Sequence, residues 1–307
     1  FATDQQKQIL SRYNGLGPLG EILLSDNKGG DWTKSNLEFY EDSQRLKELL
    51  KEIGEKTGTN PLKTAKESSL NAYYTSLPVI RSIWDGLTAG KFTGGRILEG
   101  SMGSGRFIGG MPPHVMASSR IKGVDLDVVS SLISRYLYPK VSVSNTGLQQ
   151  ASTPSNYYDL FISNIPFGTN KIYDPQIDKK GPLWKQSQEK IHTYFFAKAI
   201  DSVRPGGYIA ILTSANVLDS QSNQGIRDLM NQETDFVGAV RLSSDAFNAD
   251  AGTQVVTDIV LLRKKVDKSA PSTNEDINTI STKRVPHKDR NRPEQAIKYN
   301  EYFQRNP

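Results

Sequence analysis

Between residues 96 and 263 the chain alternates short apolar segments with amphipathic ones, and this alternation restricts the possible folds more than any other feature. Helical periodicity predicts helices at residues 105–115, 127–138, 191–203 and 223–231. Seven segments have the composition of strands: residues 96–99, 121–125, 141–144, 159–163, 208–213, 236–242 and 255–263. Strands that alternate with helices predict an α/β fold, with a mostly parallel sheet covered by helices on both faces. No helix of convincing length separates the last two strands, so we expect them to pair antiparallel at one edge.

The flanking regions differ from this central part. Residues 1–90 are predicted to form an N-terminal helical region, residues 91–263 the α/β domain, and residues 264–307 a polar basic linker or tail. From residue 263 onward there are 11 Lys and Arg against 6 Asp and Glu, whereas the first 262 residues hold 27 of each. A basic tail on a neutral body fits contact with nucleic acid, and it fits a solvated linker equally well. The chain begins with Phe rather than Met, so we expect it to be a processed or excised piece of a longer protein.

The composition excludes several classes of chemistry. The chain has no Cys, which rules out disulfides, thiolate metal sites and every thiol nucleophile, including the one that cytosine C5 methylation requires. Its three His residues are far apart in the sequence, so no metal is expected. No apolar run approaches the ~18 residues of a membrane span, so no membrane association is expected.

A glycine-rich loop follows the first predicted strand and opens a helix. Its sequence is Glu99-Gly-Ser-Met-Gly-Ser-Gly105, and Asp125 stands at the end of the next strand, 22 residues beyond Gly103. Glycines allow a tight turn close to a ligand, and an acid about 20 residues further on commonly binds ribose hydroxyls. Glu99 would repel a phosphate but attract an ammonium group. The pattern therefore favours S-adenosylmethionine, which has an amino-acid end and a ribose but no phosphate.

A second motif follows the apolar strand at residues 159–163. Asn164-Ile165-Pro166-Phe167 would lie at the carboxyl edge of the sheet, where α/β proteins bind ligands. The Asn164 side-chain oxygen and the Ile165 carbonyl can accept hydrogen bonds from an exocyclic amine, which localises its lone pair. Pro166 stiffens the turn, and Phe167 offers a face on which an extruded base can stack.

At these residues the chain resembles the gamma class of N6-adenine DNA methyltransferases, in which the corresponding motif is Asn-Pro-Pro-Tyr/Phe. The closest likeness is to the methylase domain of large methylase/helicase proteins carried by bacterial plasmids and mobile elements. It rests on Asn71-Ala-Tyr-Tyr-Thr-Ser76, on the glycine loop, and on His192-Thr-Tyr-Phe-Phe196 leading to Arg204-Pro-Gly-Gly207. The resemblance implies a Rossmann-like S-adenosylmethionine-dependent methyltransferase fold and a location in the bacterial cytoplasm.

The resemblance also implies roles for individual residues. Asn164, Ile165, Pro166 and Phe167 would form the catalytic motif, and Phe247 would lie across the flipped adenine from Phe167. The cofactor would be held by Tyr74, Thr75, Glu99, Gly103, Gly105, Asp125, Leu126, Leu148 and Gln149. Three positions depart from the family pattern: Gly100 and Ile165 stand where the family usually has Pro, and Gln149 replaces an acid.

The predicted function is methyl transfer from S-adenosylmethionine to the N6 amine of adenine in DNA. The same chemistry suits an adenine in RNA or a protein glutamine amide, because the motif serves any planar nitrogen. A catalytically silent cofactor- or DNA-binding module of a larger mobile-element protein is a further alternative. Only 44 residues follow the catalytic sheet, too few for a sequence-recognition domain, so we expect that domain in the rest of a larger parent chain or in a separate partner.

Overall fold

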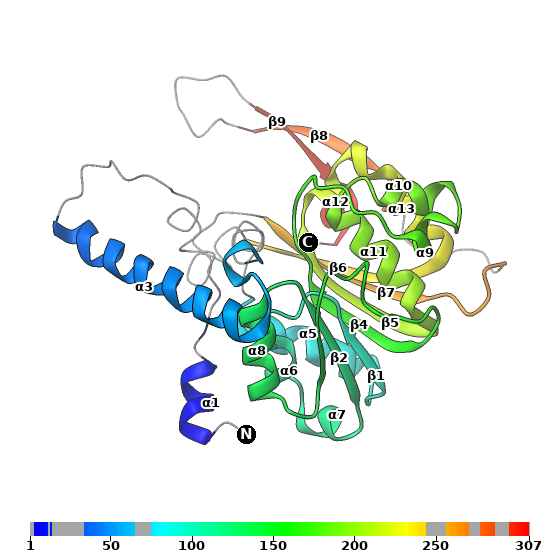
Figure 1. Ribbon diagram of the computed structural model, residues 1–307. Coiled ribbons are helices and arrows are strands. Elements are labelled where there is room, and N and C mark those ends of the chain that lie inside the picture. Colours follow the sequence, from blue (N-terminus) through cyan, green and yellow to red (C-terminus); the bar gives the residue numbers. More distant parts are fainter. Residues whose placement is uncertain are drawn as a thin grey trace. The chain divides into compact units, whose positions relative to one another are not determined.

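The computed structural model describes residues 3–11, 13, 34–64, 75–243, 256–269, 277–285 and 295–306. Its main sheet has seven strands in the order β3-β2-β1-β4-β5-β7-β6 (Figure 1). The strands are β1 (Arg96–Glu99), β2 (Arg120–Asp125), β3 (Ser142–Asn145), β4 (Tyr158–Asn164), β5 (Val203–Ser214), β6 (Thr234–Leu242) and β7 (Thr257–Lys264). β2 with β3 and β4 with β5 pair parallel, whereas β7 pairs antiparallel with both β5 and β6. The mostly parallel sheet with an antiparallel edge pair is confirmed.

The chain divides into two compact units, which are treated separately below. The first comprises Phe1–Gly94, Leu98–Ala151 and Ala246–Gln254. The second comprises Gly95–Ile97, Ser152–Asp245 and Val255–Pro307. The domain boundaries expected from the sequence, at residues 90 and 263, stay a prediction.

The first unit contains the helices that precede the sheet and those around β2 and β3. They are α1 (Asp4–Leu10), α3 (Lys34–Thr57), α5 (Leu77–Ala89), α6 (Arg106–Gly109), α7 (Pro113–Ala117) and α8 (Val128–Leu137). Ile80, Ile83, Trp84 and Leu87 form one buried face of α5. The Trp84 indole donates to the carbonyl of Phe107 at 2.9 Å, which fixes α5 to α6. The helix predicted at residues 105–115 is two short helices, because Pro112 and Pro113 cannot continue the helical hydrogen bonding of α6.

The second unit packs its helices around β4 and β5. They are α9 (Pro175–Asp178), α10 (Pro182–Ser187), α11 (Ile191–Ser202), α12 (Asn216–Asp219), α13 (Gln224–Glu233) and α15 (Tyr302–Arg305), with a 3-10 turn at Gln221–Asn223. Leu160, Phe161 and Ile162 of β4 are buried, as the sequence predicts for a strand covered on both faces. In the described part of the chain, no helix is both long and apolar enough to cross a membrane.

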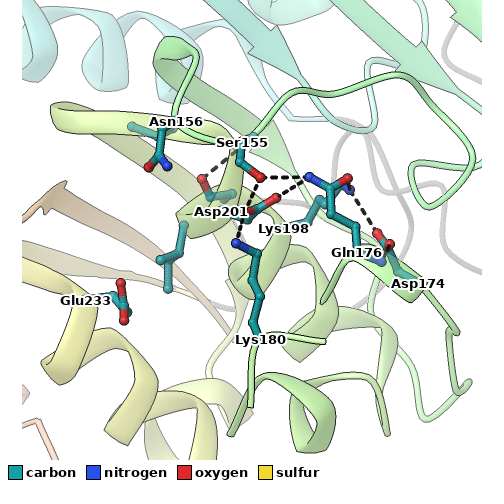
Figure 2. Close-up of polar contacts among 12 residues, drawn as sticks. Ser155, Asn156, Asp174, Gln176, Lys180, Lys198, Asp201 and Glu233 are labelled. Atoms are coloured by element: carbon teal, nitrogen blue, oxygen red, sulfur yellow. Dashed lines mark hydrogen bonds and ion pairs between the residues drawn. The ribbon is translucent and has the colours of Figure 1, made fainter. Parts of the chain in front are cut away.

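Residues 168–189, for which the sequence predicts neither a helix nor a strand, contain α9 and α10. Asp174 accepts hydrogen bonds from the Tyr194 hydroxyl at 2.8 Å and the Lys198 ammonium at 2.9 Å, and all three side chains are buried (Figure 2). Gln176 links this group to Asp201 at 2.9 Å. These contacts fasten α9 to α11, which explains why a polar sequence is folded here.

The polar tail also departs from the expected linker. The strands β8 (Ile280–Val285) and β9 (Gln295–Asn300) form an antiparallel pair, and α15 follows directly. Ile277, Asn300 and Tyr302 are buried, so the described part of this segment packs against the second unit. Its strands were not recognisable from the sequence because they carry few apolar side chains.

Candidate cofactor and amine sites

The glycine loop after β1 has the backbone conformation that its composition predicts. Gly103 and Gly105 have φ values of 52° and 79°, a region that residues with a Cβ rarely adopt. A Cβ at Gly105 would also lie 2.5 Å from Cε2 of Tyr138. The Met102 N–H donates to the Val124 carbonyl at 3.0 Å, which holds the loop against the end of β2. The sequence therefore needs glycine at position 105.

Asp125 at the end of β2 braces this loop. Its Oδ2 accepts from the Gly103 N–H at 2.7 Å, and its Oδ1 accepts from the Asp127 N–H at 2.8 Å. Asp127 caps α8 by accepting from the Ser130 N–H at 2.8 Å. Burial, together with the charge of Asp127, raises the pKa of Asp125 to about 7, although the two backbone N–H groups oppose this shift.

Glu99 is the most unusual group in the first unit. Its side chain is 1% exposed, and neither carboxylate oxygen has a hydrogen-bond partner in the described part of the chain. Burial, and secondarily the charge of Asp125, raises the pKa of Glu99 well above its ordinary value. A buried carboxylate without a partner costs free energy, whereas a bound cation would supply the missing partner. The donor set thus fits an ammonium group, as on the amino-acid end of S-adenosylmethionine.

The remaining residues expected around the cofactor are placed as follows. Thr75 is buried, and its hydroxyl has no partner among the residues that the structure describes. Leu126 is 44% exposed directly after Asp125, Leu148 is buried, and Gln149 is half-buried. Tyr74 and Phe247 lie outside the described residues. Leu126 is thus an exposed apolar side chain next to Asp125, the acid that is expected to bind the ribose.

The amine motif follows β4 in the second unit. Asn164, the last residue of β4, pairs with Leu212 of β5, and the Ile165 N–H donates to the Leu212 carbonyl at 3.1 Å. Ile165 is buried, whereas Asn164, Pro166 and Phe167 are half-buried. The buried strand therefore fixes the start of the motif and leaves its polar and aromatic side chains partly accessible.

Sequence reasoning missed a charged cluster in the same unit. Arg241, near the end of β6, forms ion pairs with Asp219 of α12 at 2.9 Å and with Asp258 of β7 at 2.8 Å. Its guanidinium also lies 4.0 Å from the ring centre of Phe303 in α15. These partners are far apart in the sequence, and no local pattern connects them.

A cavity of about 380 Å³ lies near the opposite end of β4, where Asn156 precedes the strand. Its lysines are already engaged: Lys180 pairs with Asp201 at 2.7 Å (Figure 2), and Lys268 pairs with Glu233 at 2.6 Å. Lys264 donates to the amide oxygen of Asn156 and to carbonyls in the last turn of α11, which is a favourable place for a cation. The charged side chains that line the cavity are thus accounted for by helix capping and by ion pairs within the chain.

Known proteins with the same fold define the class of protein. A type I restriction-modification methyltransferase subunit from Streptococcus thermophilus aligns with a TM-score of 0.54 and 16% identity, covering 68% of this chain and 50% of that one. A protein from Listeria monocytogenes assigned to the class I S-adenosylmethionine-dependent methyltransferases aligns with a TM-score of 0.52 and 17% identity, covering 64% and 62%. The fold is therefore that of the class I S-adenosylmethionine-dependent methyltransferases.

The family follows from the sequence match. Residues 134–303 match the N-6 DNA Methylase family, so the chain belongs to this family, and the predicted resemblance to N6-adenine DNA methyltransferases is confirmed. "Defense against restriction protein B" of Escherichia phage P1 is 28% identical over 198 residues, which are 64% of this chain and 8% of that protein. The chain thus spans less than a tenth of this relative and about half to three fifths of the two solved structures. The matched range includes the amine motif and the C-terminal hairpin, whereas the glycine loop precedes it.

Proposed function

We propose that this chain is the catalytic domain of a protein that transfers a methyl group from S-adenosylmethionine to the N6 amine of adenine in DNA. The observation that carries the proposal is the Asn164-Ile165-Pro166-Phe167 motif at the end of buried β4, within the range that matches the N-6 DNA methylases. The glycine loop supports the choice of cofactor, because Glu99 at its start is buried and has no hydrogen-bond partner among the described residues.

The first unit would hold the cofactor, which supplies an electrophilic sulfonium methyl group when bound. Glu99 would accept from its ammonium group, Thr75 and Tyr74 would flank the methionine part, and Asp125 would accept from the ribose hydroxyls. Gly103 and Gly105 would let the backbone approach closely. Leu126 and Leu148 would pack on the adenine ring, and the Gln149 side-chain oxygen would accept from its amine.

The amine motif would hold the base. The Asn164 side-chain oxygen and the Ile165 carbonyl would accept from the two N6 hydrogens, which turns the nitrogen lone pair toward the methyl carbon. With the amine held in this way, N6 would take the methyl group as the sulfonium S–C bond is broken, and the proton left over on N6 would pass to solvent. Phe167 and Phe247 would stack on the extruded base, and positioning would supply most of the rate enhancement.

The substrate and the setting of the longer protein are part of this proposal. DNA is favoured because the names of two similar proteins refer to restriction. They are the Streptococcus thermophilus methyltransferase subunit and the phage P1 protein. We also propose a bacterial cytoplasmic location, and a sequence-recognition domain elsewhere in the parent chain or in a separate partner.

The decisive experiment follows tritiated methyl groups from S-adenosylmethionine into unmethylated DNA, RNA and protein, using the full-length parent protein. We expect label in DNA, recovered as N6-methyladenine after digestion to nucleosides. Label in RNA or in a glutamine amide would overturn the substrate but preserve the chemistry. Cofactor binding without transfer to any acceptor would identify a silent module instead.

A further inference from the structure

The C-terminal hairpin is fastened at its base by Asn300, the last residue of β9. Asn300 is fully buried, and its N–H donates to Asp219 Oδ1 of α12 at 2.7 Å. Its side-chain amide donates to the carbonyls of Leu218 at 3.1 Å and Ile277 at 2.5 Å. Its Oδ1 accepts from the Tyr302 N–H at 3.0 Å. One side chain thus joins α12, both ends of the hairpin and α15.

This anchoring point lies at the same edge of the sheet as the amine motif. β4 and β5 run parallel, and Asn164 at the end of β4 pairs with Leu212 near the end of β5. α12 begins two residues after β5 ends, and β9 packs beside α12 (Figure 1). The base of the hairpin is therefore fixed beyond the carboxyl ends of β4 and β5, where the target base would have to enter.

The described strands of the hairpin carry only positive charge. β8 and β9 contain Lys283, Arg284 and Lys298 and no Asp or Glu, whereas the first 262 residues are neutral. Lys283 and Lys298 are both exposed, and the register of the strands places them on opposite faces of the ribbon. A two-stranded hairpin has little core of its own, so a concentration of cations here serves contacts outside the chain.

We propose that the β8–β9 hairpin contacts the phosphate backbone of the DNA that flanks the target adenine. The identity of the nucleic acid rests on the proposed function; the position and the charge of the surface do not. Exposed lysines neutralise phosphates and release counterions, and a two-stranded ribbon has the width to enter a major groove. The same residues give non-specific affinity and hold the duplex beside the amine motif.

Substitution of both exposed lysines tests this surface without removing the buried anchor. In the Lys283→Gln/Lys298→Gln variant, binding to a fluorescent 30-base-pair duplex should weaken at least tenfold at 0.1 M salt. The slope of log K against log salt should fall by about 1.8, roughly 0.9 for each lost phosphate contact. Fluorescence anisotropy over a salt series measures both quantities. An unchanged thermal midpoint would show that the hairpin is still folded.

A matched control removes the same charge elsewhere. Lys91 and Lys140 are exposed in turns that precede β1 and β3, away from the carboxyl ends of the strands, so Lys91→Gln/Lys140→Gln should leave the slope almost unchanged. Equal losses in both variants, no loss in the hairpin variant, or a loss seen with single-stranded RNA only would overturn the proposal. Loss of duplex binding in the hairpin variant supports it even if the parent protein transfers no methyl group, so the two failures are distinguishable.

Discussion

Glu99 offers the sharpest test of the cofactor site, because its removal should affect binding and folding in opposite directions. The Glu99→Gln substitution keeps the size and one acceptor oxygen but removes the charge. In the free protein, this carboxyl is buried without a partner among the residues that the structure describes, and burial holds its pKa well above the ordinary value, so Gln should leave the thermal midpoint unchanged or raise it. Binding of the ammonium group should weaken, because its ion pair with a carboxylate becomes a hydrogen bond to an uncharged amide oxygen.

The size of this loss follows from the strength of the interaction. A hydrogen bond to a charged group contributes about 1.5–3 kcal/mol, which corresponds to roughly 10–150-fold in affinity. Because burial raises the pKa of Glu99, part of this gain is offset wherever the free carboxyl is still protonated. We therefore expect a loss of at least about tenfold that grows as the pH rises and Glu99 ionises. The demethylated product of the cofactor is the suitable ligand, because it keeps the ammonium group and cannot react.

Titration calorimetry measures both the affinity for the ligand and the number of protons released when it binds. Binding of a cation favours the ionised form of Glu99, so the wild-type protein should release a proton to the buffer at any pH at which the free Glu99 carboxyl is still protonated. The binding heat should then vary linearly with the ionisation enthalpy of the buffer, and Glu99→Gln should reduce that slope. Glu52→Gln, which alters an exposed carboxylate of α3, is the control and should change neither quantity. Equal affinity of wild type and Glu99→Gln across the pH series would refute the assignment.

Stability without ligand has a related pH dependence. The pKa of Asp125 rises from 3.8 to about 7 in the folded protein because of burial and the charge of Asp127, and the pKa of Glu99 also rises. Between the pKa that each acid has in the unfolded chain and its higher pKa in the folded chain, the folded chain binds more protons than the unfolded chain. The contribution of the two acids is therefore complete below pH 4 and is lost as the pH rises toward 7. Denaturant titrations from pH 5 to 7.5 should show that Glu99→Gln has a shallower decline than the wild type.

Three further substitutions test other parts of the site. Asn164→Ala should lower methyl transfer about 100-fold or more while leaving calorimetric cofactor affinity unchanged, since it removes a preorganised polar contact; a normal transfer rate would contradict amine activation. Phe167→Ala should weaken capture of the flipped base by about 1–3 kcal/mol, measured by 2-aminopurine fluorescence at the target position. Gly105→Ala should lower the thermal midpoint, because position 105 has a positive φ and lies against Tyr138. Gly86→Ala, in open space on α5, is its control and should stabilise the chain by up to ~1 kcal/mol.

The strands and the amine motif could be predicted because their signals are local. β4 is a run of apolar residues that ends at Asn164, and this run alone fixes both the buried strand and the start of the motif. The antiparallel pairing of β7 followed from the absence of a helix before it. Asp125 was expected from its spacing after Gly103, and the structure places its carboxylate on the Gly103 N–H.

The missed features depend on contacts between distant residues. α9 is held by the buried pair of Asp174 and Lys198, two residue types that usually indicate solvent exposure. The C-terminal hairpin is held by Asn300, whose partners Leu218 and Asp219 lie about 80 positions earlier in the chain. A polar residue in a polar segment gives no sign that it is buried, so this segment could only be taken for a linker.

The two halves of the site rest on different evidence, and this decides how the experiments should be interpreted. Asn164 lies within the range that matches the N-6 DNA methylases, so its role is supported by family membership together with its position at the end of β4. Glu99 precedes that range, and its role rests on a buried carboxylate that has no partner in the described part of the chain. Normal cofactor affinity in Glu99→Gln would therefore refute the proposed role of Glu99 but leave the family assignment intact. A normal transfer rate in Asn164→Ala would instead mean that Asn164 does not activate the amine, whereas a silent module would transfer no methyl group in either the wild type or the variant.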